Sequence, residues 1–124
     1  MQNRPTKKMV KEYVRKRLAN EDKMAIKALL MVFNHQTSDE QSTDRTRYQN
    51  NVGFTAFDAE FLTKLAKQYQ EKNWLSVKQL AILKKIMPKY WKQVIDACDY
   101  HKLEDMAYKN YVNNLEAVQE NLNI

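Results

Sequence analysis

The sequence predicts an all-α fold, a compact bundle of about five helices with one long polar loop over residues 36–54. Glycine occurs once and proline twice in 124 residues, whereas sheet proteins of this size use both residues in many tight turns. Residues with high helix propensity are plentiful, namely Lys, Gln, Leu, Ala and Met. Hydrophobic residues make up 44% of the chain, which is typical of globular proteins. We therefore expect a single helical domain spanning residues 1–124.

Two helices are predicted before the polar loop. A basic N-terminal helix is expected within residues 1–18, where apolar side chains recur at helical spacing: Met9, Val10, Tyr13, Val14 and Leu18. Asn20 is a favourable N-cap for a second helix, and Glu21 and Asp22 suit the positive end of its dipole. This second helix is expected to run to about His35. Its apolar residues surround much of its circumference, which predicts the central, buried helix of the bundle.

Three further helices are predicted after the loop. Thr55 and Asp58 have the spacing of a capping box that opens the third helix, and its expected apolar stripe is Phe57, Phe61, Leu62, Leu65 and Tyr69. Ser76 and Gln79 open the fourth helix in the same way, and its expected core face is Leu80, Leu83, Met87, Tyr90 and Val94. Pro88 should kink or restart this helix. The last helix is expected over roughly residues 101–121, with inward residues Leu103, Met106, Tyr108, Tyr111, Val112, Leu115 and Leu122.

Charge is unevenly distributed along the chain, whose net charge is +6. Residues 1–18 contain seven Lys and Arg against one acidic residue, and residues 63–95 contain eight against one. The segment 19–62 is net negative, and residues 96–124 contain two basic residues against six acidic ones. Two concentrated basic blocks are typical of proteins that bind a polyanion. The segregation also permits head-to-tail self-association between a basic surface and the acidic C-terminal helix.

The second basic block predicts a nucleic-acid surface. Four of its lysines recur at spacings of seven, four and three residues, and they are Lys78, Lys85, Lys89 and Lys92. These spacings place them on one side of a continuous helix, opposite its core face. Lys64 and Lys67 on the preceding helix would extend the surface across a helical hairpin. A solvated helix face that is rich in lysine for solubility alone is the structural alternative.

Aromatic residues are interleaved with these lysines. Trp74, Tyr90 and Trp91 lie within the same stretch of sequence, and an indole ring beside a lysine is a natural stacking platform for an unpaired base. We therefore add Trp91 to the candidate nucleic-acid contacts. The alternative is that these rings belong to the hydrophobic core.

The first basic block predicts a second phosphate-binding segment. Its candidate residues lie on the N-terminal helix and are Lys7, Lys8, Lys11 and Arg15. Arginine presents a planar fork that fits phosphate oxygens, whereas a frayed, soluble N-terminus is the structural alternative. No helix-turn-helix signature is present, because the short glycine-bearing turn between two helices is missing. We therefore expect contacts with the nucleic-acid backbone or with single strands rather than sequence-specific readout of a duplex.

The polar loop is predicted to be a recognition segment. The residues assigned to recognition are Gln36, Thr37, Asp39, Glu40, Gln41 and Asn51. Thr37 and Glu40 have the spacing of a capping box, and Gly53 suits a backbone angle that other residues avoid. The carboxylates of this segment, with that of Asp58 after it, could supply the oxygen ligands that a divalent cation needs. Their spacing matches no metal-binding loop, so we expect recognition rather than catalysis here.

No catalytic, metal or cofactor site is predicted, so the chain is expected not to be an enzyme. Cys98 is the only cysteine, and His35 and His101 are the only histidines, which leaves too few ligands for a structural zinc site. A nucleophile built from Cys98 and His101 has no support beyond their proximity. No glycine-rich phosphate loop occurs. The sequence also has no signal peptide and no membrane-spanning apolar run, so we expect a cytoplasmic protein without a membrane partner.

Five short segments occur in order between Asn20 and Gln93. They are an N-D opening at Asn20 and Asp22, Q-T-x-D-E-Q at 36–41, N-x-V-G-F-x-x-x-D-A at 50–59, L-S-x-K-Q at 75–79 and K-Y-x-x-Q at 89–93. As an ordered set, covering about three-fifths of the chain, they resemble a module of small phage and prophage proteins that also occurs near phage-type helicase regions. Pro88 and Val94 depart from that pattern. The resemblance implies a phage setting and an association with DNA transactions, and it assigns no chemical role to single residues.

The sequence therefore favours a phage-type accessory protein of the host-cell cytoplasm that binds nucleic acid non-specifically through the lysine-rich helical hairpin. The alternative is a protein-interaction factor, such as a phage inhibitor that docks on a host nucleic-acid enzyme or defence complex. In that case a host or phage protein is the partner, and loop 36–54 provides specificity. An ordered loop flanked by exposed aromatic residues would favour this alternative, whereas lysines that are scattered or buried against the acidic helix would weaken the nucleic-acid hypothesis.

Overall fold

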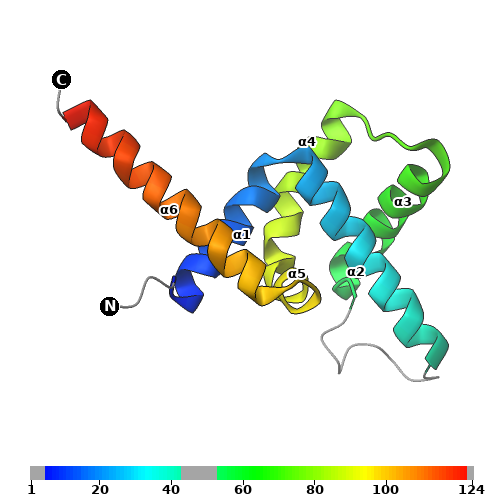
Figure 1. Ribbon diagram of the computed structural model, residues 1–124. Coiled ribbons are helices and arrows are strands. Elements are labelled where there is room, and N and C mark those ends of the chain that lie inside the picture. Colours follow the sequence, from blue (N-terminus) through cyan, green and yellow to red (C-terminus); the bar gives the residue numbers. More distant parts are fainter. Residues whose placement is uncertain (1–4, 43–52, 123–124) are drawn as a thin grey trace.

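The computed structural model describes residues 5–42 and 53–122, with side chains over 5–36 and 53–117, and this part of the chain contains helices and no strands. The helices before the loop are α1 (Lys7–Asn20) and α2 (Asp22–Ser42). Those after it are α3 (Ala56–Lys72), α4 (Val77–Ile86), the short 3₁₀ helix η2 (Met87–Tyr90), α5 (Trp91–Ala97) and α6 (Tyr100–Leu122). Because α4, η2 and α5 form one bent, continuous unit (Figure 1), the predicted all-α bundle of about five helices is confirmed.

Helix α2 is the centre of the bundle, as the sequence predicts. It packs against α1, α3, α4 and α5, and Figure 1 shows it crossing between α4 and α3. Its buried residues recur every three to four positions and are Ala25, Ala28, Leu29, Val32 and Phe33. This spacing gives one continuous apolar face along the helix.

The boundaries of α2 differ from the predicted ones at both ends. The helix continues to Ser42 rather than ending near His35, so Thr37 and Glu40 lie within it and open no new helical turn. Residues 36–42 contain neither Gly nor Pro, and a helix continued through them keeps its backbone hydrogen bonds. At the other end, Asn20 belongs to α1, and its side-chain amide donates to the carbonyl of Lys16 (2.7 Å) instead of capping α2.

The bend between α4 and α5 follows from Pro88. Proline has no backbone N–H and cannot occupy the interior of an α-helix without breaking a hydrogen bond. The chain responds with the 3₁₀ turn of η2, in which Pro88 is near the first position. Upstream, the predicted capping box at the start of α4 is confirmed: Ser76 Oγ accepts from the Gln79 N–H (3.1 Å), and Gln79 Oε1 accepts from the Ser76 N–H (2.9 Å).

The core is formed by the inward faces of α1 to α5 and the first turns of α6. The predicted core face of α4, η2 and α5 is confirmed, because Leu83, Met87, Tyr90 and Val94 are buried and Leu80 is partly buried against them. One predicted core residue of α3 is not: Phe57 is 94% exposed. No helix in the described part of the chain is long and apolar enough to cross a lipid bilayer.

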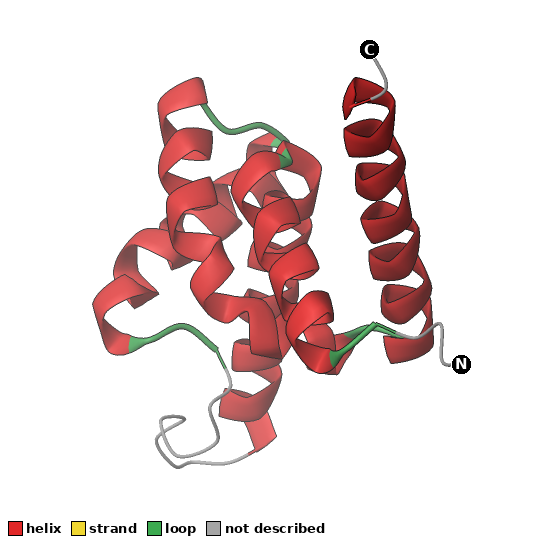
Figure 2. Ribbon diagram, turned by 90° about the vertical axis from the view of Figure 1, so that its left-hand side faces the viewer, coloured by secondary structure: helices red, strands yellow, loops and turns green. Residues whose placement is uncertain are grey.

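Helix α6 packs on the bundle through its first half only. Leu103 and Ala107 are buried, whereas Met106, Tyr111 and Leu115 are 39%, 47% and 50% exposed. The prediction of an inward stripe along the whole helix is therefore wrong for these three residues. Figures 1 and 2 show the physical reason: α6 stands at one side of the bundle, and in Figure 1 its C-terminal half leads away from the other described helices.

The buried face of α4 is expected to carry much of the stability. Leu83→Ala removes a fully buried side chain and should lower the free energy of unfolding by about 2–5 kcal/mol. Its matched control is Ile82→Ala at the next position, where the side chain is 44% exposed, and this change should cost about 1 kcal/mol or less. Urea unfolding followed by circular dichroism measures both, and equal losses would contradict the assigned core face.

Candidate nucleic-acid interface and loop clamp

The two basic blocks of the sequence meet where α1 packs against η2 and α5. Lys11 Nζ lies 4.6 Å from the centre of the Trp91 ring, which is a cation–π contact between the first block and the second. Lys8 and Arg15 are exposed on the same flank of α1 as Lys11, since residues three and four apart share a helix face. Lys92 is exposed beside Trp91. This basic surface, composed of Lys8, Lys11, Arg15 and Lys92, joins residues about 80 positions apart in the sequence.

Trp91 has a different position from the predicted one. Its side chain is partly buried and packs against the hydrophobic core, and Lys11 lies over its ring. The indole therefore holds Lys11 in place, and stacking on a base would require Lys11 to move. Trp74 is 54% exposed, but it lies in the turn between α3 and α4.

The predicted stripe of four lysines is not continuous. Lys78 and Lys85 are exposed and seven residues apart on α4, so they share its outward side. The 3₁₀ turn then advances the chain by 120° per residue instead of 100°. Lys89 consequently faces α3, where its ammonium group pairs with the carboxylate of Asp58. Lys89 thus has a structural partner inside the protein, and Lys92 belongs to the surface shared with α1.

Lys64 and Lys67 do not join that surface. Both are exposed on α3, and Lys64 forms a surface ion pair with Glu60 (3.8 Å). Figure 1 shows α1 and α3 on opposite sides of α2 and α4. The predicted α3–α4 hairpin face is therefore separated from the N-terminal basic block. Lys7 is also exposed, at the first position of α1.

A buried network around Asp58 connects α3 to η2. The side chain is 4% exposed, and its Oδ2 accepts hydrogen bonds from the Tyr90 hydroxyl (2.6 Å) and the Thr55 hydroxyl (3.1 Å). Lys89 supplies the opposite charge. Thr55 is the N-cap of α3, but its hydroxyl binds Asp58 instead of a backbone N–H, so neither hydrogen bond of the predicted capping box is formed and that prediction is wrong. Its backbone N–H donates to the Tyr90 hydroxyl (3.0 Å).

The network shifts the titration of both acidic groups. Burial alone would raise the pKa of Asp58, but hydrogen bonds from Lys89, Tyr90 and Thr55 and the charge of Lys89 outweigh burial and lower it below its usual value. Burial, reinforced by the hydrogen bond to Asp58, raises the pKa of Tyr90 to about 12. The carboxylate is therefore ionised and the phenol neutral at pH 7. This combination serves as a structural clamp, with neither group positioned as a proton acceptor for a ligand.

The end of the polar loop is fixed by two glutamines. Gln36 Oε1 accepts from the Phe54 N–H (2.8 Å), and the Gln93 side chain both accepts from the N–H and donates to the carbonyl of Gly53 (3.0 Å each). Phe54 packs between Phe33 and Tyr90, with ring centres 6.4 and 5.9 Å apart. The two flanks of segment 37–52 are thus joined directly. We call the combined arrangement of these bonds and the Asp58 network the loop clamp.

The loop clamp joins residues from several of the five ordered segments of the sequence. Residues from three of the five segments converge in it: Gln36; Gly53, Phe54 and Asp58; and Lys89, Tyr90 and Gln93. From the other two segments, Asp22 pairs with Lys84 (2.8 Å), and Gln79 exchanges amide hydrogen bonds with Gln68 (2.9 Å each). These side chains bond to one another within the fold, so we assign structural roles to them. No clamp role was predicted for Tyr90 or Gln93 from the sequence. The signal that could have identified them is their shared membership of the K-Y-x-x-Q segment at 89–93.

Of the six predicted recognition residues, only Gln36 has a described side chain. Gln36 is buried in the clamp and is not available to a partner. Thr37, Asp39, Glu40 and Gln41 lie on the helical backbone of α2, and their side chains are outside the described residues, as is Asn51. Over the described side chains, no group of three or more His, Cys, Asp and Glu could hold a metal ion.

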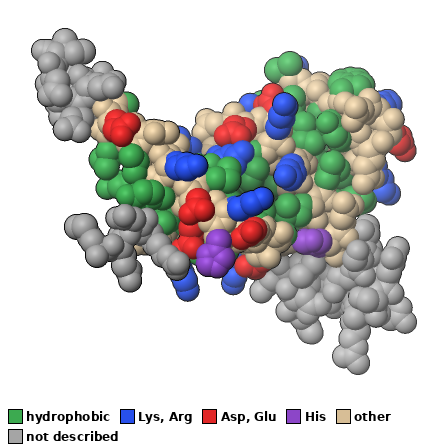
Figure 3. All heavy atoms as spheres, viewed as in Figure 1, with side chains coloured by type: hydrophobic (Ala, Val, Ile, Leu, Met, Phe, Trp, Pro, Cys, Tyr) green, Lys and Arg blue, Asp and Glu red, His purple; other side chains and the backbone are tan. Residues whose placement is uncertain are grey.

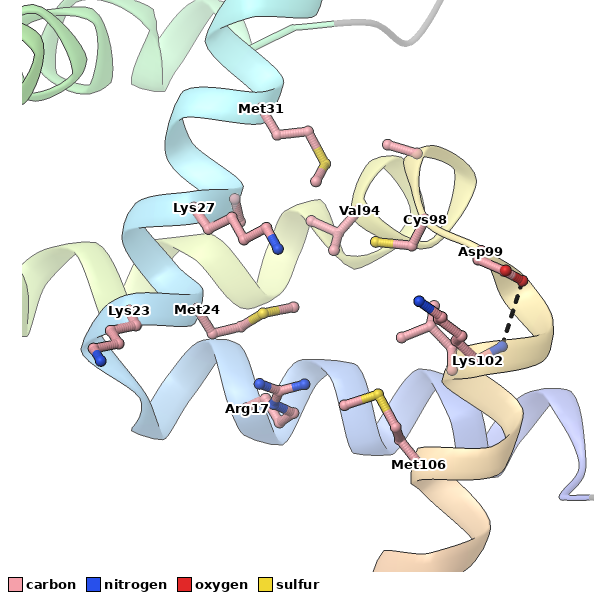
Figure 4. Close-up of a pocket in the computed structure, with 13 residues that line it drawn as sticks. Arg17, Lys23, Met24, Lys27, Met31, Val94, Cys98, Asp99, Lys102 and Met106 are labelled. Carbon is pink, nitrogen blue, oxygen red and sulfur yellow. Dashed lines mark hydrogen bonds between the residues drawn. The ribbon is translucent and has the colours of Figure 1, made fainter.

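A cavity of about 660 Å³ lies between α1, α2, α5 and α6, where no site was predicted. Its apolar lining includes Met24, Met31, Val94, Leu103 and Met106. Figure 4 shows the three methionines pointing into it, with Lys23 and Lys27 on α2 and Lys102 on α6 at its edges. The cavity could not be predicted from the sequence, because its lining residues come from four separate segments. Val94, Leu103 and Met106 among them were predicted to be core residues.

Gly53 is required by the geometry of the clamp. Its φ of +91° is unfavourable for other residues, and a Cβ atom there would lie 2.7 Å from Gln36 Oε1 and 2.8 Å from Gln36 Cβ. Gly53→Ala should therefore reduce the free energy of unfolding by about 1–3 kcal/mol, which a thermal melt would detect as a drop of several degrees. An unchanged melting temperature would contradict the assigned clamp.

Asp58 should give the protein a characteristic acid sensitivity. Because folding lowers the pKa of Asp58, its ionised form stabilises the fold at neutral pH, and this contribution is lost as the pH falls below about 4. Asp58→Asn should lower the free energy of unfolding by about 1–3 kcal/mol at pH 7. The difference from the native protein should shrink towards pH 2.5 in urea titrations. The exposed Asp96 provides the control, since Asp96→Asn should change the free energy of unfolding at pH 7 by about 0.5 kcal/mol or less; a loss for Asp58→Asn that is the same at pH 7 and pH 2.5 would disprove the assignment.

The chain matches no protein-family model, no curated protein and no solved structure. Its function is therefore inferred from the surfaces and side chains described above.

Proposed function

We propose that this protein binds nucleic acid through phosphate contacts made by the basic surface of α1 and α5. The observation that carries the proposal is the contact between Lys11 and Trp91 (4.6 Å), which holds the first basic block against the second. Lys8, Arg15 and Lys92 are exposed around it. Like charges at these spacings repel one another, and a polyanion relieves that repulsion while releasing its own counterions.

The composition of the surface favours contacts with the phosphate backbone of the nucleic acid rather than with its bases. Three of its four residues are lysines, which act as point charges, and Arg15 contributes a fork for phosphate oxygens. Trp91 is covered by Lys11 and partly buried, so it positions a cation and does not add base stacking. Binding is expected to be weakly selective for sequence and strongly dependent on salt.

A second candidate function is recognition of a protein partner beside the polar loop. Phe57 follows the clamped loop end and is 94% exposed, and exposed aromatic side chains are enriched at the centres of protein interfaces. The basic surface would then lie against acidic groups of the partner. Loss of partner binding on Phe57→Ala, in a native protein that binds no nucleic acid at low salt, would favour this second function.

Charge reversal on α1 tests the nucleic-acid proposal. Lys8→Glu with Arg15→Glu should weaken binding of labelled single-stranded DNA, duplex DNA or RNA by at least about tenfold, since each charged contact contributes about 1.5–3 kcal/mol. The dependence of log K on log salt should flatten by about two. Fluorescence anisotropy at low and moderate salt measures both quantities.

Lys64→Glu with Lys67→Glu is the matched control, because it changes the net charge equally on the exposed face of α3. It should reduce binding far less. Equal losses from both double variants would show that binding depends on net charge and not on this surface. Absence of binding by the native protein at low salt would overturn the proposed function.

A further inference from the structure

The cavity between α1, α2, α5 and α6 has the properties of a binding site for an acidic, apolar segment. Its interior is lined by three methionines, whose flexible thioethers adapt to an inserted apolar side chain. Its volume of about 660 Å³ is within the usual range for ligand sites. In the space-filling view of Figure 3, basic and acidic side chains lie among hydrophobic surface across the middle of this face.

The rim of the cavity is strongly basic. Its four cations are Arg17, Lys23, Lys27 and Lys102, and the one acid among its lining residues is Asp99. The Asp99 carboxylate accepts hydrogen bonds from the backbone N–H groups of His101 and Lys102 (3.0 and 3.4 Å), so it serves as the cap of α6. Arg17 is paired with Glu21 (3.0 Å), which leaves three lysines to meet an incoming ligand.

These lysines lie on more than one wall. Lys23 and Lys27 belong to α2, whereas Lys102 belongs to α6 on the other side of the cavity (Figure 4). An apolar helix face flanked by a carboxylate matches both the methionine lining and the basic rim.

The C-terminal half of α6 is a segment of that kind. Tyr111 and Leu115 are half exposed, and Glu116 is exposed next to them. In sequence, the apolar positions continue at 118 and 122 with a second acid at 120, and residues 110–124 contain no Lys or Arg. In this segment, which we call the α6 end (residues 111–117), the described part of the same chain leaves Tyr111 and Leu115 about half exposed.

The α6 end cannot fill the cavity of its own chain. Residues Asp99 to Met106 form one wall of that cavity, and α6 is an uninterrupted helix from Tyr100 to Leu122. At 1.5 Å per residue, Leu115 is about 14 Å beyond Met106 along the helix axis. Figure 1 shows the helix leading away from the bundle, so the segment can reach only the cavity of another molecule.

We propose that the α6 end of one copy of this chain binds in the basic, methionine-lined cavity of a second copy. Leu115 and its apolar neighbours enter the cavity, and Glu116 meets the lysines of the rim. This contact joins two different surfaces, so it either closes into a ring or continues into chains. It uses the Arg17 flank of α1, opposite the flank that carries Lys8, Lys11 and Arg15, and it is independent of the proposed nucleic-acid surface.

Complementary variants test the self-association by sedimentation velocity over a range of protein concentrations. The native protein should show a concentration-dependent increase in mass. Leu115→Glu should weaken association at least about tenfold, because it puts a charge at the centre of the apolar contact. Lys27→Glu with Lys102→Glu should weaken it similarly by reversing the rim. Val77→Glu is the matched control, since Val77 is 84% exposed on α4, and it should have no effect.

Mixing the two defective variants provides the decisive measurement. The Leu115→Glu protein retains an intact cavity and the Lys27→Glu, Lys102→Glu protein retains an intact α6 end, so the mixture should recover a one-to-one complex. A native protein that remains monomeric at all concentrations, or a mixture that does not associate, would overturn the proposal. Circular dichroism verifies that each variant is folded. Nucleic-acid binding by Leu115→Glu at concentrations where the protein is monomeric should be unchanged, which separates this proposal from the proposed function.

Discussion

A carboxylate removed from water is stable only when charges and hydrogen bonds replace its hydration, and Asp58 imposes this requirement on the whole chain. Its partners are Thr55 at the start of α3 and Lys89 and Tyr90 in η2. Both η2 residues must face α3 to reach it, which fixes the rotation of η2 and hence of α5. Because η2 and α5 also pack against α1, the position of the basic N-terminal helix follows from the same network.

The clamp also defines where the polar segment begins and ends. Gln36 and Phe54 are directly bonded (2.8 Å), so segment 37–52 leaves and re-enters the bundle at one place. Phe57 is exposed close to that place. The clamp residues themselves are occupied by bonds within the fold.

Three groups of basic residues have different physical roles. Lys84 and Lys89 neutralise Asp22 and Asp58 and join helices. The basic surface, centred on Lys11 over Trp91, collects cations from α1 and α5 on one flank of α1. The cavity rim places other cations around methionines on the opposite flank. The surface proposed for a polyanion and the site proposed for an acidic helix are therefore separate, and charge on either can be altered without removing the partners of a buried acid.

The sequence alone determined the helical class, the central position of α2, the capping box at Ser76 and the bend at Pro88, because propensity, periodicity and capping act within a few residues. It also located both basic blocks. Tertiary structure decided which lysines are free: Lys89 is bound by Asp58, and Lys64 lies apart from α1 (Figure 1). It likewise decided that Phe57 and Leu115 are exposed. These outcomes depend on which helices come into contact, and helical periodicity specifies an apolar face without specifying what covers it.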